Sequence, residues 1–209
     1  MQFNDYEEIN WYTKLLRATK SDAITKKERL LTNDNLDDEI MYQVYETERV
    51  IDAIDAADKS IKENLMNGQD KIMVASFSKK GDLLSQWRGY ADDGRGMAIG
   101  FDMDELGGID SEVYVAKVRY SKIKSKLDND DFLDELLWYG SMSFNSKEFF
   151  SESLATAVTY KSKKFKEEKE IRLIYQKDSF DRLIRRNKAF TDNKNTGSSS
   201  YGGAIAVLS

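Results

Sequence analysis

The sequence has no cysteine, no histidine and no proline among its 209 residues. Without cysteine there is no disulfide, no thiolate nucleophile and no zinc–thiolate site. Without histidine there is no Ser–His–Asp triad, no imidazole base and no imidazole metal ligand. Any chemistry must therefore come from carboxylates, lysine, arginine, tyrosine or serine, or from a metal ion held by oxygen ligands.

Long apolar runs and an excess of positive charge are missing as well. No run approaches the roughly 18 apolar residues that a membrane span needs, and no basic start leads into an apolar stretch as in a secretion signal. With 37 acidic and 32 basic residues the formal charge is −5, although Lys161 to Lys166 form a local basic run. We therefore expect a cytoplasmic protein with no membrane partner and no non-specific binding of nucleic acid; the sequence identifies no partner.

The spacing of apolar residues predicts a single α+β domain over residues 1–192, in which a mainly antiparallel sheet is flanked by helices. Residues 193–209 form a Ser/Gly-rich tail with a short terminal strand. Helical periodicity and capping residues predict helices at 4–19, 35–66, 82–91, 130–139 and 146–164, with a polar loop at 20–33. β-branched and alternating runs predict strands at 71–78, 97–101, 113–120 and 170–175, with a tight turn at 92–96.

The most distinctive stretch runs from Val74 to Asp102. It contains Phe-Ser at a strand end, then Asp-x-Leu-x-x-Trp-x-x-Tyr, then a glycine-rich turn into a strand that ends Gly-Phe-Asp. Asn4-Asp5 with Glu8 precedes this stretch, and a Phe-x-Glu-Glu-x-Glu-x-Arg block from Phe165 to Arg172 follows it. In this order the three motifs resemble the bacterial family named domain of unknown function 2971, over roughly residues 1 to 176.

The resemblance also implies that the chain is a family member truncated at both ends. Family members usually open with a strand before the Asn-Asp motif. They usually continue past the Glu-x-Glu-x-Arg strand to a Pro-Tyr segment and a closing Gly-Pro strand. This chain begins at the Asn-Asp motif and runs into the Ser/Gly stretch instead.

The Glu168-x-Glu170-x-Arg172 spacing is the first candidate site. On a strand, residues two apart share a face, so these three side chains are expected to point the same way. Two neighbouring carboxylates raise each other's proton affinity, and the charge of Arg172 offsets that effect. A solvated strand face with cross-strand ion pairs has the same pattern, and this alternative stays open.

The strand end at Phe77 and the helix after it supply the other candidates. Ser76 and Ser78 can offer hydroxyl groups to a phosphate, together with the N–H groups of the helix start. Trp87 and Tyr90 lie three apart and share a helix face, which suits core packing or a platform for ring stacking. Arg88 can bind a phosphate with two hydrogen bonds, although a solvated arginine is the commoner case.

A transferase is the first of three functions that fit these residues. A Ser-ended strand followed by a late Glu-x-Glu strand is similar to the order in NAD-dependent ADP-ribosyltransferases, an analogy at the level of the fold. The analogy implies NAD as cofactor and Glu170 as the catalytic carboxylate, with Glu168 and Arg172 orienting it or the acceptor. Ser76, Arg88 and Glu170 are then expected to line one pocket, and the absent first strand implies an incomplete site.

The alternatives are a non-catalytic binding or regulatory module and a magnesium-dependent nuclease. The missing ends and the acidic balance suit the binding module. For the nuclease, Glu167-x-Lys169 matches half of a restriction-type site, and Asp70 or Asp82 is the candidate for the second carboxylate. Whether the chain is an enzyme stays open at this stage.

Overall fold

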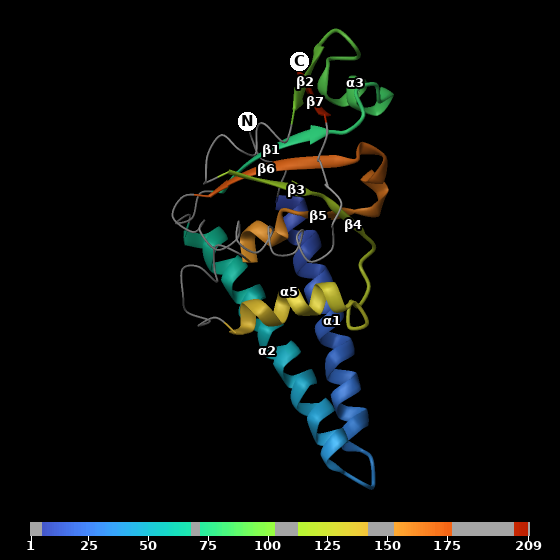
Figure 1. Ribbon diagram of the computed structural model, residues 1–209, viewed down its shortest axis with the longest axis vertical. Coiled ribbons are helices and arrows are strands. Elements are labelled where there is room, and N and C mark those ends of the chain that lie inside the picture. Colours follow the sequence, from blue (N-terminus) through green and yellow to red (C-terminus); the bar gives the residue numbers. More distant parts are fainter. Residues whose placement is uncertain (1–5, 68–71, 103–112, 142–152, 177–202, 209) are drawn as a thin grey trace, which may run out of the picture. The chain divides into compact units, whose positions relative to one another are not determined.

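The computed structural model describes residues 6–67, 72–102, 113–141, 153–176 and 203–208 (Figure 1). The chain divides into two compact units, each made of two stretches of sequence. The helical unit comprises Met1–Gln69 and Ser121–Tyr160, and the sheet unit comprises Asp70–Tyr120 and Lys161–Ser209.

Two long antiparallel helices, α1 (Tyr6–Leu31) and α2 (Asp38–Asn67), form the centre of the helical unit (Figure 1). The carboxylate of Asp37 caps α2, because its Oδ1 accepts a hydrogen bond of 2.9 Å from the N–H of Ile40. A third helix, α5 (Asp130–Ser141), is capped in the same way by Asn129, which accepts from the N–H of Phe132 at 2.8 Å. A short helical stretch follows at residues 153–157.

The first helix is much longer than the sequence predicts. The predicted polar loop at 20–33 is wrong, since α1 continues without a break to Leu31. The reason is tertiary. Ala23 is fully buried, and Lys20 and Lys27 form ion pairs with Asp55 and Glu48 of α2. Packing and ion pairing along α2 thus extend a helix that the polar sequence alone does not favour.

The core of the helical unit joins its helices through aromatic and aliphatic side chains. Tyr12 of α1 lies with its ring centroid 5.0 Å from that of Tyr160 and 6.4 Å from that of Phe132 on α5. The three rings are mutually in contact at distances typical of aromatic pairs. The largest fully buried aliphatic side chains of this unit are Leu15, Leu16, Ile54, Ile61 and Leu136.

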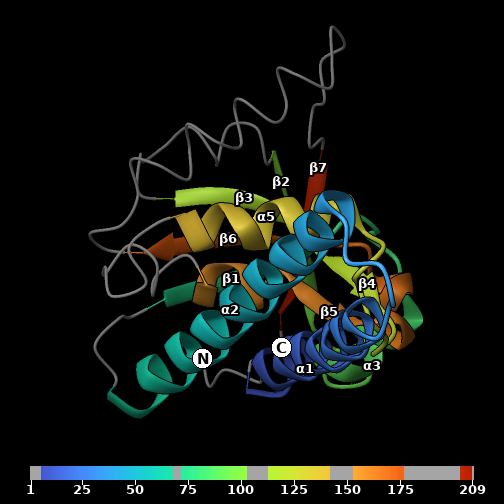
Figure 2. The same ribbon diagram turned by 90° about the horizontal axis from the view of Figure 1, so that it is seen from below.

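A five-stranded antiparallel sheet forms the sheet unit, in the order β2-β7-β1-β6-β3. Figure 2 shows β3, β6 and β1 lying side by side. The core on this sheet joins Phe77, Val115 and Ile171, with the rings of Phe77 and Phe101 in an edge-to-face contact. The strands are β1 (Ile72–Ser78), β2 (Met97–Asp102), β3 (Val113–Lys117), β6 (Glu170–Gln176) and β7 (Gly203–Leu208).

The α+β fold with a mainly antiparallel sheet is as the sequence predicts, and the four predicted strands all occur. The strand predicted at 113–120 is interrupted at Val118, whose N–H bonds to the carbonyl of Glu170, so β3 is followed by a separate short strand, β4 (Arg119–Ser121). β4 pairs with β5 (Tyr160–Ser162) in a two-stranded sheet. The short helix α3 (Leu84–Tyr90) lies within the predicted 82–91.

The helix predicted at 146–164 is wrong in its described part. Only residues 153–157 are helical there, and β5 and the 3-10 helix η1 (Lys163–Glu168) follow. Ser162 begins η1 by accepting a hydrogen bond from the N–H of Lys164, a competing local signal that apolar spacing does not reveal. Residues 146–152 lie outside the described residues.

The predicted division into a domain over 1–192 and a tail stays a prediction. Residues 193–202 of that tail lie outside the described residues, and β7 pairs with β2 and β1. In the described part of the chain, no helix combines the length and the apolar character needed to cross a membrane.

Candidate functional site

The start of β6 holds the first candidate site, but not in the predicted form. Glu170 is the first residue of β6, whereas Glu168 is the last residue of η1. Lys169 between them has φ 44° and ψ 51°, the left-handed conformation, and so turns the chain. The prediction that Glu168, Glu170 and Arg172 share one strand face is therefore wrong for Glu168. The left-handed residue breaks the period of two on which that prediction rests.

A lysine that sequence reasoning did not select brings the two carboxylates together. The Nζ of Lys161, on β5, lies 2.7 Å from Oε2 of Glu168 and 2.9 Å from Oε2 of Glu170. On the other side, Nε of Arg172 donates to Oε1 of Glu170 at 2.8 Å. The Glu170 and Arg172 side chains are only 6% and 1% exposed. We call Lys161, Glu168, Glu170 and Arg172 the carboxylate cluster; its two cations balance its two anions.

The two predicted serines lie beside this cluster on β1. In the β1–β6 register Ser76 is opposite Arg172 and Ser78 is opposite Glu170. Ser76 forms a side-chain hydrogen bond with Glu170. Ser78 donates through Oγ to the carbonyl of Glu168 at 2.8 Å and accepts from the N–H of Lys80 at 2.9 Å. Ser78 thus ties the η1–β6 turn to β1.

The charges of the cluster set the protonation states of its members. Burial raises the pKa of Glu170, but the charge and hydrogen bond of Arg172, the charge of Lys161 and the Ser76 hydrogen bond outweigh burial and lower the pKa below its ordinary value. Burial lowers the pKa of Lys161, yet the two glutamates raise it above the ordinary lysine value. Both groups are therefore charged at neutral pH.

Tyr120 completes the surroundings of Glu170. Its Oη accepts a hydrogen bond of 2.8 Å from the N–H of Glu170. Burial, with the charges of Glu170 and Glu168, raises the pKa of Tyr120 to about 12, although the hydrogen bond from Glu170 and the charge of Lys161 act in the opposite direction. In this arrangement neither Glu170 nor Tyr120 exchanges a proton near pH 7, so neither is suited to general acid–base catalysis there.

A second candidate site is a hollow of about 610 Å³ beside α3, within the size range of small-molecule sites. We call it the α3 hollow. The indole Nε1–H of Trp87 donates to Oδ1 of Asp82 at 3.0 Å, and this hydrogen bond fixes the orientation of the indole ring. Among the described residues, the guanidinium of Arg88 has no hydrogen bond or ion pair. The hollow is lined by Leu84, Trp87, Arg88, Asp93, Gly94 and Gly96.

The turn that closes the hollow is held by one backbone carbonyl. The carbonyl of Ala91 accepts hydrogen bonds from the N–H groups of Gly94, Arg95 and Gly96, at 2.8 to 2.9 Å. Gly94 has φ +90°, a conformation that residues with a side chain rarely adopt. This glycine therefore serves the geometry of the turn, as the glycine-rich motif suggests.

The predicted site residues fall into two groups in the sheet unit. Ser76, Glu168, Glu170 and Arg172 come together in or beside the carboxylate cluster, whereas Trp87 and Arg88 line the α3 hollow. Ser76 and Glu170 are not among the residues that line this hollow, so the hollow is not the common pocket expected for Ser76, Arg88 and Glu170. Tyr90 is 55% exposed and does not line the hollow either. The functional roles of all these residues remain predictions.

The sequence pattern does not indicate Lys161 as a site residue, because this lysine stands out there only as part of a basic run. Lys161 lies nine positions before Glu170, across a turn and a 3-10 helix, and no strand or helix period relates the two. The usable signal is chemical. Glu170 and Arg172 balance each other's charge, so the second carboxylate, that of Glu168, needs another cation. A lysine near in sequence is the natural partner for it.

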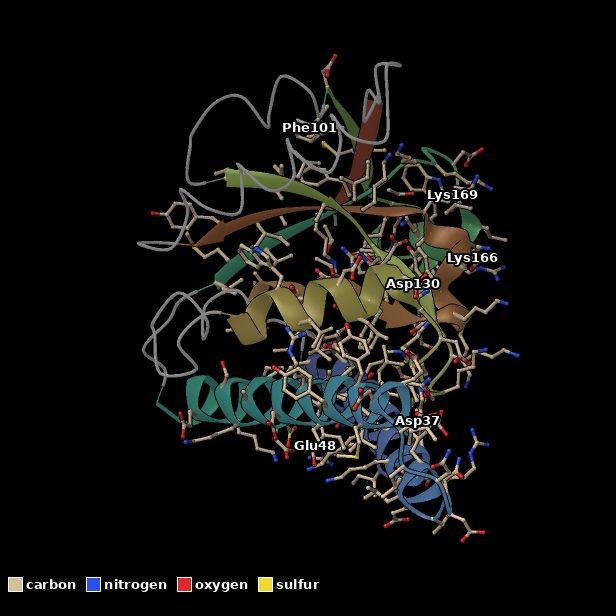
Figure 3. All side chains as sticks on the ribbon, turned by 60° about the horizontal axis from the view of Figure 1, so that its bottom comes forward. Asp37, Glu48, Phe101, Asp130, Lys166 and Lys169 are labelled. Atoms are coloured by element: carbon tan, nitrogen blue, oxygen red, sulfur yellow. The ribbon has the colours of Figure 1, made fainter. Side chains whose placement is uncertain are left out.

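The described residues offer no metal site. They contain no group of three or more Asp or Glu side chains that could hold a metal ion. Asp82, a candidate ligand for the nuclease hypothesis, accepts the hydrogen bond from Trp87. Lys169, of the Glu167-x-Lys169 pair, occupies the left-handed turn before β6 (Figure 3). Asp70 lies outside the described residues.

Comparison with known proteins identifies a family for part of the chain. No curated protein and no solved structure matches it. One family model, described as a protein of unknown function (DUF2971), matches residues 86–173. This range includes Trp87 and Arg88 of the α3 hollow and all four members of the carboxylate cluster. Over residues 86–173 the chain is therefore similar to this family, in agreement with the resemblance that the sequence motifs predict.

Proposed function

We propose that the sheet unit is a binding module that takes a small ligand in the α3 hollow, and that the carboxylate cluster holds the fold rather than performing catalysis. One observation carries this proposal: both carboxylate oxygens of Glu170 are already engaged, one by Arg172 and one by Lys161. A buried carboxylate whose two oxygens are both held in ion pairs is poorly placed to receive a substrate. The α3 hollow, by contrast, combines an aromatic ring, that of Trp87, with the charged side chains of Arg88 and Asp93.

The lining of the hollow suggests the chemical class of the ligand. Trp87 offers an aromatic surface for stacking against a flat ring. Arg88, which has no partner among the described residues, offers a planar guanidinium that matches a carboxylate or phosphate with two hydrogen bonds. Asp93 adds an acceptor for hydroxyl or amino groups. The ligand that fits is a small planar ring that carries an anionic group.

Isothermal titration calorimetry with three probes tests this class. We expect adenosine monophosphate, which has both ring and anion, to bind more tightly than adenosine or inorganic phosphate alone. Trp87→Leu and Arg88→Gln are each expected to weaken that binding by about tenfold or more, because each removes one of the two contacts. Arg49→Gln, at an exposed arginine of α2, is the matched control and should leave the binding unchanged. Equal affinity for all probes, or no effect of either hollow variant, would contradict the proposal.

A transferase-like reaction with NAD is the second candidate, because one observation favours it. Ser76 and Glu170, which the transferase analogy requires together, are joined by a hydrogen bond. The cluster as it stands does not fit a bound NAD, however, since Glu170 is 6% exposed and both of its oxygens are in use. Any role of Glu170 toward a substrate requires that Lys161 or Arg172 give up its contact first.

A nicotinamide-release assay separates the two candidates. The binding module predicts no release of nicotinamide from NAD by the chain, with or without an acceptor protein. Release that disappears in Glu170→Gln and persists in Glu167→Gln, an exposed neighbour, would instead favour the transferase. The melting temperature of each variant must accompany the assay, because loss of the fold also abolishes activity.

A further inference from the structure

The hairpin of α1 and α2 exposes an unusual share of the large apolar side chains. Of thirteen large hydrophobic residues that are exposed in the described part of the chain, six lie between residues 24 and 45. They occupy the last turns of α1, the connection, and the first turns of α2. The six are Ile24, Leu31, Leu36, Met41, Tyr42 and Tyr45. Apolar side chains gathered in this way mark an interaction surface more often than scattered ones do.

Four of these side chains belong to one face of the hairpin, which the ion pairs between the helices define. Lys27 of α1 lies 2.6 Å from Glu48 of α2. On α1, Ile24 lies three positions before Lys27 and Leu31 lies four positions after it. On α2, Tyr45 lies three positions before Glu48 and Met41 lies seven positions before it. Residues at these spacings share a helix face. We call Ile24, Lys27, Leu31, Met41, Tyr45 and Glu48 the hairpin face.

The hairpin face lies on the side of α2 away from α5. The groove between α2 and α5 is lined from α2 by a different set of positions, among them Glu39, Gln43 and Glu46. Figure 3 shows Glu48 on the side of α2 opposite α5. In the described structure, no helix of the helical unit therefore covers the hairpin face.

The charges along this face are separated by helix. Three ion pairs cross between the helices: Arg17 with Asp58, Lys20 with Asp55, and Lys27 with Glu48. In each pair α1 supplies the cation and α2 supplies the anion. At these three heights a row of cations from α1 therefore lies beside a row of anions from α2, and at one end Asp58 also pairs with Lys62 of α2. A surface with two such rows is complementary to itself after a half-turn.

From this pattern we infer that the hairpin face is a self-association surface and that its partner is a second copy of this chain. A two-fold axis parallel to the hairpin places α1 of one copy over α2 of the other and keeps the residues at the same height. Lys27 of each copy then meets Glu48 of its partner copy. The four charges alternate in sign, and the apolar side chains on both sides of them are buried. The inference is independent of the proposed ligand site.

The size of the face indicates a weak dimer. From residue 17 to residue 31, α1 rises roughly 20 Å, and two packed helices are roughly 20 Å wide. The face therefore covers about 400 Å², which is less than the roughly 800 Å² per partner of a stable interface. We expect a monomer–dimer equilibrium that depends on concentration and weakens as salt increases.

Sedimentation equilibrium of two charge variants, alone and mixed, tests the proposed geometry. In Lys27→Glu, positions 27 and 48 of each copy are both anionic. In Glu48→Lys, the same two positions are both cationic. Each variant alone is expected to dimerise about tenfold more weakly than the wild type, because like charges meet across the axis. An equimolar mixture should recover dimers, since the two variants are complementary to each other. Failure of the mixture to recover dimers would overturn the proposed pairing of α1 with α2.

An apolar variant tests the face itself. Met41→Lys is expected to abolish dimers, whereas Met73→Lys, at an exposed methionine of β1, is the matched control and should leave the dimer intact. A wild-type chain that stays monomeric at the highest soluble concentration overturns the inference. Loss of dimers in Met73→Lys as well would also overturn it, because association would then not belong to the hairpin face.

Discussion

Replacing Glu170 by glutamine is the sharpest test of what the carboxylate cluster does. Glutamine has nearly the same volume, so packing around the first residue of β6 is preserved. It has no charge, however, and only one of its two polar atoms can accept a hydrogen bond. The variant removes the anion that lies 2.8 Å from Arg172 Nε and 2.9 Å from Lys161 Nζ. If Glu170 is a catalytic residue, this change costs activity and little stability. If it balances buried cations, it costs stability.

The magnitude follows from burial. Arg172 is 1% exposed, so the guanidinium cannot exchange the lost carboxylate for water. Breaking a buried ion pair by removing one partner costs about 3–5 kcal/mol. For a chain of this size each kcal/mol corresponds to roughly 2–4 °C in melting temperature, so we expect a decrease of about 6–20 °C. Urea unfolding followed by circular dichroism measures the free energy, and Glu167→Gln, at an exposed glutamate of η1, is the control. A free energy of unfolding within about 0.5 kcal/mol of the wild type would refute this reasoning.

The dependence on pH supplies an internal check on the same variant. The pKa of Glu170 in the folded chain is lowered from an ordinary value of 4.5. The contribution of Glu170 to stability is therefore complete above pH 4.5 and is lost as the pH falls below that value toward the folded pKa. The difference in unfolding free energy between wild type and Glu170→Gln should be constant from pH 7 to about pH 5 and should shrink below it.

Three further variants test other contacts. Lys161→Met leaves Glu168 and Glu170 facing each other, so its urea midpoint should improve relative to wild type as pH falls from 7 to 5, because protonation of one carboxylate relieves the repulsion. Gly94→Ala puts a side chain at φ +90° and should cost about 1–3 kcal/mol in chemical denaturation. Thr19→Val leaves the N–H of Lys126, which donates to Thr19 Oγ1 at 3.0 Å, without its acceptor and should cost about 1–3 kcal/mol.

Local sequence patterns predicted the helices and strands well where apolar residues follow a regular helical or strand period. The runs at 71–78 and 170–175 have the β-branched composition of buried strands, and both occur as β1 and β6. The helix α2 has one uninterrupted apolar stripe, and its predicted limits differ from the observed ones by at most a few residues. The second half of α1 was missed because its stability comes from ion pairs to α2, which no local pattern reveals.

The candidate site was predictable in its residue types and not in its arrangement. The motifs identified Glu168, Glu170, Arg172 and Trp87, and the structure places the first three of these in one cluster. The strand period failed at Lys169, because a non-glycine residue in the left-handed conformation has no clear sequence signature. Arg88 lines the α3 hollow and is not part of the cluster. The turn beside that hollow is held by hydrogen bonds to the carbonyl of Ala91, which residue spacing does not reveal.

The position of β7 in the sheet has a consequence for how the protein is made. β7 lies between β2 and β1, so it connects them, and yet it is the last of the five strands along the chain. Asp102 of β2 meets Gly203 of β7, across roughly a hundred residues. During synthesis β2 must therefore wait, without a strand partner among the described elements, until β7 has left the ribosome. The sheet closes late, and the nascent chain needs protection from aggregation for most of its translation.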